Sequence, residues 1–138
     1  MNHATDKLAG ALEQVDLSLA QILADCDPLV EDYVGHAASA RGKLIRPRLM
    51  LTVASIFEQA DMPQVARCAA CCELLHTATL IHDDVIDQAD TRRGNLTLNN
   101  RFGNEIAVVV GDYLFALVLK AINAERDFQL MPVSYTHL

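Results

Sequence analysis

The residues best suited to chemistry are aspartates gathered in one stretch of the chain: Asp83, Asp84, Asp87 and Asp90. After its first residue, the segment from about Pro63 to Asp90 has no glycine or proline, and it is rich in good helix formers. On a helix, Asp83 and Asp87 project from one face, one turn apart. Mg²⁺ takes one or two such carboxylates together with water and phosphate oxygens. The spacing therefore indicates a Mg²⁺ site for a diphosphate substrate, with a solvated acidic patch as the alternative.

Apolar neighbours favour a site over an acidic patch. Leucine, isoleucine and valine residues surround the carboxylates on the same segment, namely Leu74, Leu75, Leu80, Ile81, Val85 and Ile86. A helix with such neighbours is buried on most sides, so its polar stripe must face a cavity or a partner. Counting back from Asp83 in helical steps reaches Thr79, His76 and Cys72. We therefore expect His76 on the face that carries the aspartates.

Two basic pairs are the expected counterpart of these carboxylates. Lys43 and Arg46 stand before Pro47, at the predicted start of a helix, where free N–H groups and the helix dipole favour an anion. Arg92 and Arg93 directly follow the aspartate helix. Alone, such residues are ordinary surface cations or a favourable helix end. Their occurrence together with the aspartates indicates a site for diphosphate anions.

The apolar residues recur at helical spacing along most of the chain, which predicts an all-α fold. The chain has few glycines and prolines, and its 138 residues are enough for one compact domain. Arg92-Arg93-Gly94-Asn95 is expected to end the aspartate helix, and a short helical piece is expected between it and the last helix. The predicted helices cover about residues 8–23, 27–39, 47–57, 63–90 and 105–126.

Composition and charge bear on binding partners and on cellular location. The net charge of −7 and the pI near 5.0 lack the basic stripe that nucleic-acid binding requires, so no nucleic acid is expected. The most apolar window, Ile106 to Ile122, is interrupted by charged residues and predicts a buried helix, not a transmembrane segment. The cysteines stand in helical sequence and no export signal precedes them, so a cytoplasmic location is expected.

The ordered motifs resemble those of the trans-prenyl diphosphate synthases. They are Gly42-Lys43-x-x-Arg46-Pro47, His76-x-x-x-Leu80-x-His82-Asp83-Asp84-x-x-Asp87 and Arg92-Arg93-Gly94. The resemblance covers roughly residues 30 to 125, includes Gly111-Asp112, and is greatest to bacterial long-chain members of the octaprenyl type. It implies the N-terminal half of an isoprenoid-synthase helical bundle. Arg41, where the family commonly has glycine, is one departure.

The resemblance also implies roles for single residues. Asp83 and Asp87 would ligate Mg²⁺, and Asp84 would support the site by hydrogen bonding. Lys43, Arg46, His76 and Arg93 would bind isopentenyl diphosphate, while Arg92 would hold the allylic diphosphate. Small residues at Ala78 and Thr79 would leave a tunnel open for a long all-trans product. A homodimer is implied for the full-length protein.

A second aspartate-rich motif of the family is absent from these 138 residues. We therefore expect residues 1–131 to be the N-terminal portion of a polyprenyl synthase domain that is inactive alone. Residues 132–138 have no helical pattern and resemble a translated sequencing adapter, so we expect them to be a non-native tail.

Three other interpretations remain open at this point. His82-Asp83 is similar to the His-Asp doublet of metal-dependent phosphohydrolases, but that class leaves the basic pairs without a role. Cys68, Cys72 and His76 share a helical face on which a Zn²⁺ site is conceivable, although small residues there more often allow close helix packing. The third interpretation is a non-catalytic subunit with the fold of a prenyl synthase.

Overall fold

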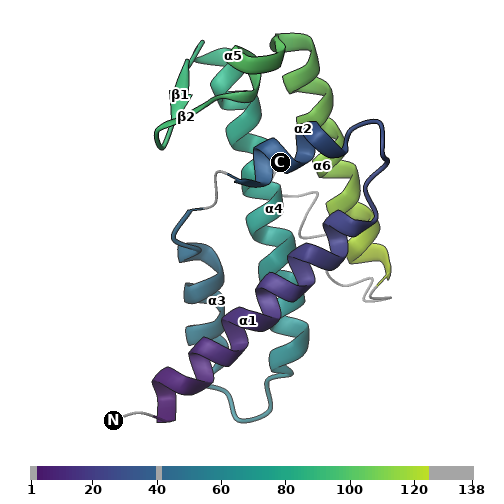
Figure 1. Ribbon diagram of the computed structural model, residues 1–138. Coiled ribbons are helices and arrows are strands. Elements are labelled where there is room, and N and C mark those ends of the chain that lie inside the picture. Colours follow the sequence, from purple (N-terminus) through teal and green to yellow (C-terminus); the bar gives the residue numbers. More distant parts are fainter. Residues whose placement is uncertain (1–2, 40–41, 125–138) are drawn as a thin grey trace.

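The computed structural model describes residues 3–39 and 42–124, with side chains from Leu8 onward. The described part is all-α except for one small hairpin (Figure 1), which confirms the predicted fold class. Its elements in chain order are α1 (His3–Ala24), α2 (Glu31–Ser39), α3 (Ile45–Ala54), α4 (Met62–Ile86), β1 (Thr91–Arg92), β2 (Asn95–Leu96), α5 (Leu98–Phe102) and α6 (Asn104–Ala124).

The long helix α4 is the centre of the molecule. It packs against α1, α3 and α6, and its own small and apolar side chains, Ala66 to Ile81, supply much of the buried core. Figure 1 shows α3 beside the first half of α4, whereas the hairpin and α5 lie at its far end. The end of α4 that carries the aspartates therefore lies beside the hairpin and α5, and it also packs against α6 through His82.

Both ends of α4 have local causes. The Asp61 side chain accepts a hydrogen bond from the Gln64 N–H at 3.1 Å and so caps the helix, with Pro63 in the first turn. The helix ends at Ile86, about four residues earlier than expected. Gln88 has φ of 51°, and the Ala89 N–H donates to the Asp84 carbonyl oxygen at 3.0 Å. This is a Schellman motif, which a glutamine gives little reason to expect.

The segment after α4 corrects the prediction that Arg92-Arg93-Gly94-Asn95 merely ends the helix. Thr91 pairs with Leu96 and Arg92 with Asn95 in an antiparallel hairpin. Its two turn residues, Arg93 and Gly94, have φ of 53° and 82°, as a type I′ turn requires at both positions. The hairpin turns the two arginines back beside α4 instead of letting them follow it.

The other predicted helices are present with shifted ends. α2 begins at Glu31, because the Asp27 carboxylate first accepts the Leu29 N–H at 2.9 Å in a turn. α3 ends at Ala54, before a series of turns. The expected short helical piece is α5, which the Thr97 side chain caps. The predicted end of the last helix at Arg126 lies outside the described residues. No helix in the described ranges has the length and apolarity needed to cross a membrane.

Candidate functional site

Asp83 and Asp87 form the carboxylate face, at the C-terminal end of α4. The Asp87 N–H donates to the Asp83 carbonyl oxygen at 2.8 Å, so the two residues lie one regular helical turn apart. Both side chains are exposed, and neither makes a hydrogen bond or ion pair within the described part of the chain. The helix dipole also places negative partial charge here. Two unpaired carboxylates in this position fit a hard cation such as Mg²⁺, which needs few protein ligands.

Asp84 lies between these two residues in sequence but has a different environment. Its side chain is buried, and both carboxylate oxygens accept from Arg92. The Nε–H of Arg92 donates at 2.8 and 3.0 Å, and its Nη2–H donates at 2.6 Å. This hydrogen bond with Asp84 is the main cause that raises the pKa of Arg92. Asp84 therefore fixes the guanidinium in place, and among the described residues no acceptor takes the N–H groups of Nη1, which could meet another anion.

A cavity of about 80 Å³ opens beside the hairpin. Its polar and charged lining residues come from α2, α4, the hairpin and the start of α5: His36, Glu73, His76, Thr77, Asp84, Arg92, Arg93 and Thr97. We call it the hairpin cavity. It brings His76, Arg92 and Arg93 together, which are three of the residues expected to bind diphosphate. Asp83 and Asp87 do not line it, so the carboxylate face and the hairpin cavity are separate neighbouring surfaces.

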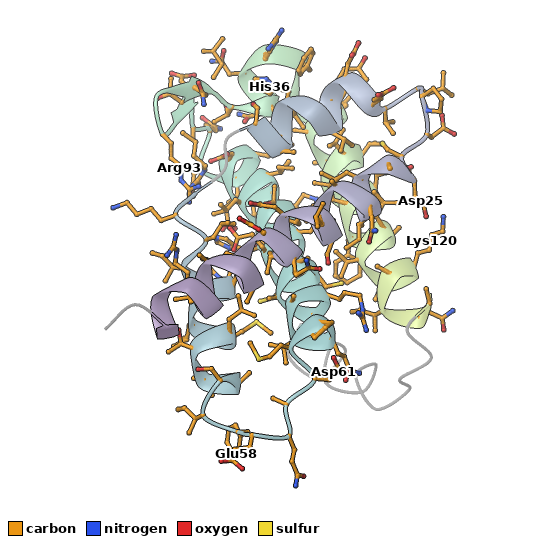
Figure 2. The ribbon with its side chains drawn as sticks, turned by 60° about the horizontal axis from the view of Figure 1, so that its bottom comes forward. Asp25, His36, Glu58, Asp61, Arg93 and Lys120 are labelled. Atoms are coloured by element: carbon orange, nitrogen blue, oxygen red, sulfur yellow. The ribbon has the colours of Figure 1, made fainter. Side chains whose placement is uncertain are left out.

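Arg93 is held against the chain that connects α2 to α3. A Cβ atom at Gly42 would lie 2.8 Å from Cζ of Arg93, so any larger residue would require the guanidinium to shift from this position. This close approach gives a physical reason for glycine in the motif that precedes Lys43. Arg93 projects from the loop side of the molecule, far from Asp61 at the other end of α4 (Figure 2). Arg41, which precedes Gly42 in the sequence, lies outside the described residues.

Lys43 and Arg46 are exposed and do not line the hairpin cavity. Arg46 is nevertheless close enough to act electrostatically on His76 and Cys72. Between the two cations, Leu44 has φ of 50°, and no side chain caps the start of α3. The first N–H groups of α3 therefore remain available next to both cations, as the sequence predicts for an anion site.

His76 faces a strongly cationic environment. Burial is the largest cause that lowers its pKa, and Arg46, Arg93 and Arg92 lower it further, while Glu73 opposes them. Glu73 is a residue that the motif reasoning missed. Its Oε2 atom is buried and accepts no hydrogen bond from the described residues. A glutamate three residues before His76 was the available signal, because such positions are neighbours on a helix.

Ala78 and Thr79 lie in different surroundings. Ala78 is only 2% exposed and belongs to the core of the described part, whereas Thr79 is exposed and its hydroxyl donates to the His76 carbonyl oxygen at 2.8 Å. Thr79 is four residues before Asp83, so it continues the carboxylate face by one turn. Of the two residues, Thr79 and not Ala78 is therefore exposed on this face.

His82 and the cysteines give little support to the other metal sites. His82 packs on Gly111 of α6, with Nε2 at 3.3 Å from the Val108 carbonyl oxygen and 3.5 Å from the Asp112 carboxylate. Burial raises the pKa of the Cys72 thiol, which opposes the thiolate that Zn²⁺ requires. Within residues 3–39 and 42–124, no three His, Cys, Asp or Glu side chains gather as metal ligands.

Comparison with known proteins assigns the family. The polyprenyl synthetase family model matches residues 27–136. The heptaprenyl diphosphate synthase component 2 of Geobacillus stearothermophilus is 40% identical over 116 residues, which cover 84% of this chain and 35% of that protein. The chain thus spans about a third of this relative.

Two solved structures share the fold. The heptaprenyl diphosphate synthase of Staphylococcus aureus superposes with a TM-score of 0.80 at 30% identity, covering 94% of this chain and 41% of that one. The polyprenyl synthase of Caulobacter crescentus, complexed with calcium and isoprenyl diphosphate, superposes with a TM-score of 0.79 at 29% identity, covering 95% and 41%. The chain belongs to the polyprenyl synthetase family.

Proposed function

We propose that this chain supplies the first half of the active site of a long-chain trans-polyprenyl diphosphate synthase. The reaction joins isopentenyl diphosphate to an allylic diphosphate, head to tail. The observation that carries the proposal is the pairing of two neighbouring surfaces: the unpaired carboxylates Asp83 and Asp87, and the cavity that collects His76, Arg92 and Arg93. One surface suits a cation, and the other suits an anion.

In the proposed arrangement, the carboxylate face binds the allylic substrate. Asp83 and Asp87 would hold Mg²⁺, which would supply positive charge to the departing diphosphate. That a relative of the same fold is described in complex with calcium and isoprenyl diphosphate supports a divalent cation at this site. Arg92, already oriented by Asp84, would direct its remaining N–H groups at the same diphosphate. These residues would thus be in place before charge develops on the leaving group.

The second substrate, isopentenyl diphosphate, would bind at the hairpin cavity. His76 and Arg93 line that cavity, and Lys43 and Arg46 flank Leu44, which also lines it, beside the uncapped start of α3. Fixing the diphosphate of isopentenyl diphosphate there would orient its double bond toward the allylic carbon, which is a proximity effect. Apolar lining residues such as Leu80 and Ile81 would keep water from the carbocation.

The experiment is a condensation assay on the extended chain, which continues this sequence to the length of its relatives. With Mg²⁺, isopentenyl diphosphate and an allylic diphosphate, we expect long-chain polyprenyl diphosphate to form. The 138-residue chain alone is expected to be inactive. Apolar side chains such as Leu49, Ile56 and Phe57 are more than 60% exposed, which indicates that further helices are needed to complete the core. Absence of product from the folded extended chain would refute the proposal.

A second candidate is a subunit that acts only with a partner. The name of the Geobacillus relative, component 2, makes a two-component assembly the alternative to the homodimer that we propose. Light scattering and the same assay separate the two. A homodimer that forms product without another protein supports our proposal, whereas activity that requires a different subunit supports the alternative.

A further inference from the structure

We propose that His36 is a positioning residue that sets the hairpin arginines relative to the cations that follow α2. The proposal rests on the proposed function and adds a residue to its site. His36 is on α2 and lines the hairpin cavity, but it belongs to none of the motifs that indicate the chemistry. Figure 2 shows it toward the same end of the molecule as Arg93.

Two hydrogen bonds hold the His36 ring between the hairpin and α5. Nε2 lies 2.9 Å from the Leu96 carbonyl oxygen in β2, and Nδ1 lies 3.0 Å from Nη1 of Arg101. A carbonyl oxygen can only accept and a guanidinium can only donate, so the ring must donate from Nε2 and accept at Nδ1. Both ring nitrogens of the neutral imidazole therefore make a hydrogen bond, one as donor and one as acceptor, and few other side chains could make both bonds.

Aromatic contacts fix the plane of the same ring. The Phe102 ring of α5 meets His36 edge to face, with the ring centroids 5.6 Å apart. Tyr33, one turn earlier on α2, meets Phe102 in the same way at 4.9 Å. Arg101 lies over the Phe102 ring at 5.0 Å, so the donor to Nδ1 is itself positioned. We call these four residues with Leu96 the His36 junction.

The His36 junction connects the two cation-bearing segments. On one side, Leu96 pairs with Thr91, and the neighbouring pair joins Asn95 to Arg92, so a shift of β2 moves the arginines. On the other side, α2 leads through Gly42 to Lys43, and Gly42 touches Arg93. His36 is therefore placed to fix the distance between the hairpin and the chain that precedes α3. Loss of the junction would loosen the hairpin cavity and not the carboxylate face.

The test compares His36→Phe with His36→Gln in the extended chain. Phenylalanine keeps the ring contact with Phe102 but removes both hydrogen bonds, whereas glutamine keeps a donor and an acceptor. We expect His36→Phe to raise the KM for isopentenyl diphosphate by roughly fivefold to tenfold, the loss expected for one or two hydrogen bonds, with kcat changed less than about twofold. His36→Gln should recover most of the affinity. Asp32→Asn, an exposed change on α2, is the matched control.

A second readout is independent of catalysis. Hydrogen exchange of the segment 91–97 in the 138-residue chain should become faster in His36→Phe and in Arg101→Met, but not in Asp32→Asn. Unchanged exchange in the first two variants would overturn the junction, and faster exchange with an unchanged KM would overturn its positioning role. Lack of prenyl transfer by the wild-type extended chain would instead refute the proposed function, and the exchange result alone would then decide whether the junction holds the hairpin.

Discussion

The carboxylate face and the hairpin arginines lie side by side, but they are held in different ways. Asp83 and Asp87 are positioned by one continuous helix, are exposed, and have no hydrogen bond or ion pair among the described residues. Arg92 and Arg93 are positioned by segments outside the hairpin: Asp84 of α4 binds Arg92, and Arg93 lies against Gly42, between α2 and α3. Substitutions on the carboxylate face should therefore change chemistry alone, whereas substitutions around the arginines should change stability as well.

The largest effect is expected from Asp83→Asn or Asp87→Asn in the extended chain. Each removes one proposed ligand of a hard cation with almost no change in volume, so turnover should fall by roughly two to three orders of magnitude. The circular dichroism signal should stay the same. Glu13→Gln, an exposed charge removal on α1, is the control and should keep wild-type turnover. Wild-type rates in either aspartate variant would rule out the assigned ligand.

Asp84→Asn tests the difference in stability between the two regions. It makes the same chemical change as Asp83→Asn at the next residue, but it removes the carboxylate partner of Arg92. Asp84 is 5% exposed, and the Arg92 side chain is 34% exposed, so solvent reduces the loss below that of a fully buried pair. We expect the free energy of unfolding to fall by about 2 kcal/mol. Urea denaturation measures it, with Asp83→Asn as the matched variant that should lose almost nothing. Equal losses in the two variants would contradict the distinction between them.

Product length offers a third test, on the turn before the carboxylate face. Thr79 is exposed and Ala78 is buried, so a tyrosine has different consequences at the two positions. Thr79→Tyr should shorten the product with little effect on the first condensation. Ala78→Tyr should cost about 1–3 kcal/mol of stability by overpacking, whether or not it also shortens the product. Chromatography of products and melting curves check both. An unchanged product length in active Thr79→Tyr would refute a tail that runs along this face.

The smallest effect concerns the charge of His76. Burial and the nearby arginines lower its pKa and Glu73 raises it, so Glu73→Gln should lower the pKa of His76 further. His76 would then remain neutral down to a lower pH. An NMR titration of the histidine Cε1–H signals measures this, with His76→Gln for assignment and Glu13→Gln as the control. A higher or unchanged pKa in Glu73→Gln would show that Glu73 does not act on His76.

The sequence predicts the parts of the molecule that depend on local periodicity. The helical spacing of α4, the Asp61 cap and the shared face of Asp83 and Asp87 follow from neighbours in the chain. The hairpin does not, because its turn requires positive φ at Arg93 as well as at Gly94, and arginine gives no signal for it.

The spacing of residues in the sequence also does not predict contacts between distant segments. The approach of Gly42 to Arg93 and the bond from His36 to Leu96 join elements that pack together only in the folded chain. Gly42 and Arg93 do stand in the sequence motifs, but the motifs do not indicate that the two residues lie in contact. His36 is found only from the cavity that it lines, whereas Glu73 could also be found from its position three residues before His76.

The most direct test of the central claim is a calorimetric titration of inorganic diphosphate into the extended chain, with and without Mg²⁺. If Asp83 and Asp87 hold the cation against the diphosphate, Mg²⁺ should strengthen binding in the wild type but not in the double variant Asp83→Asn/Asp87→Asn. Binding without Mg²⁺, which the arginines support, should be weaker and similar in both proteins. An equal strengthening by Mg²⁺ in the wild type and the double variant would contradict the assignment of the carboxylate face.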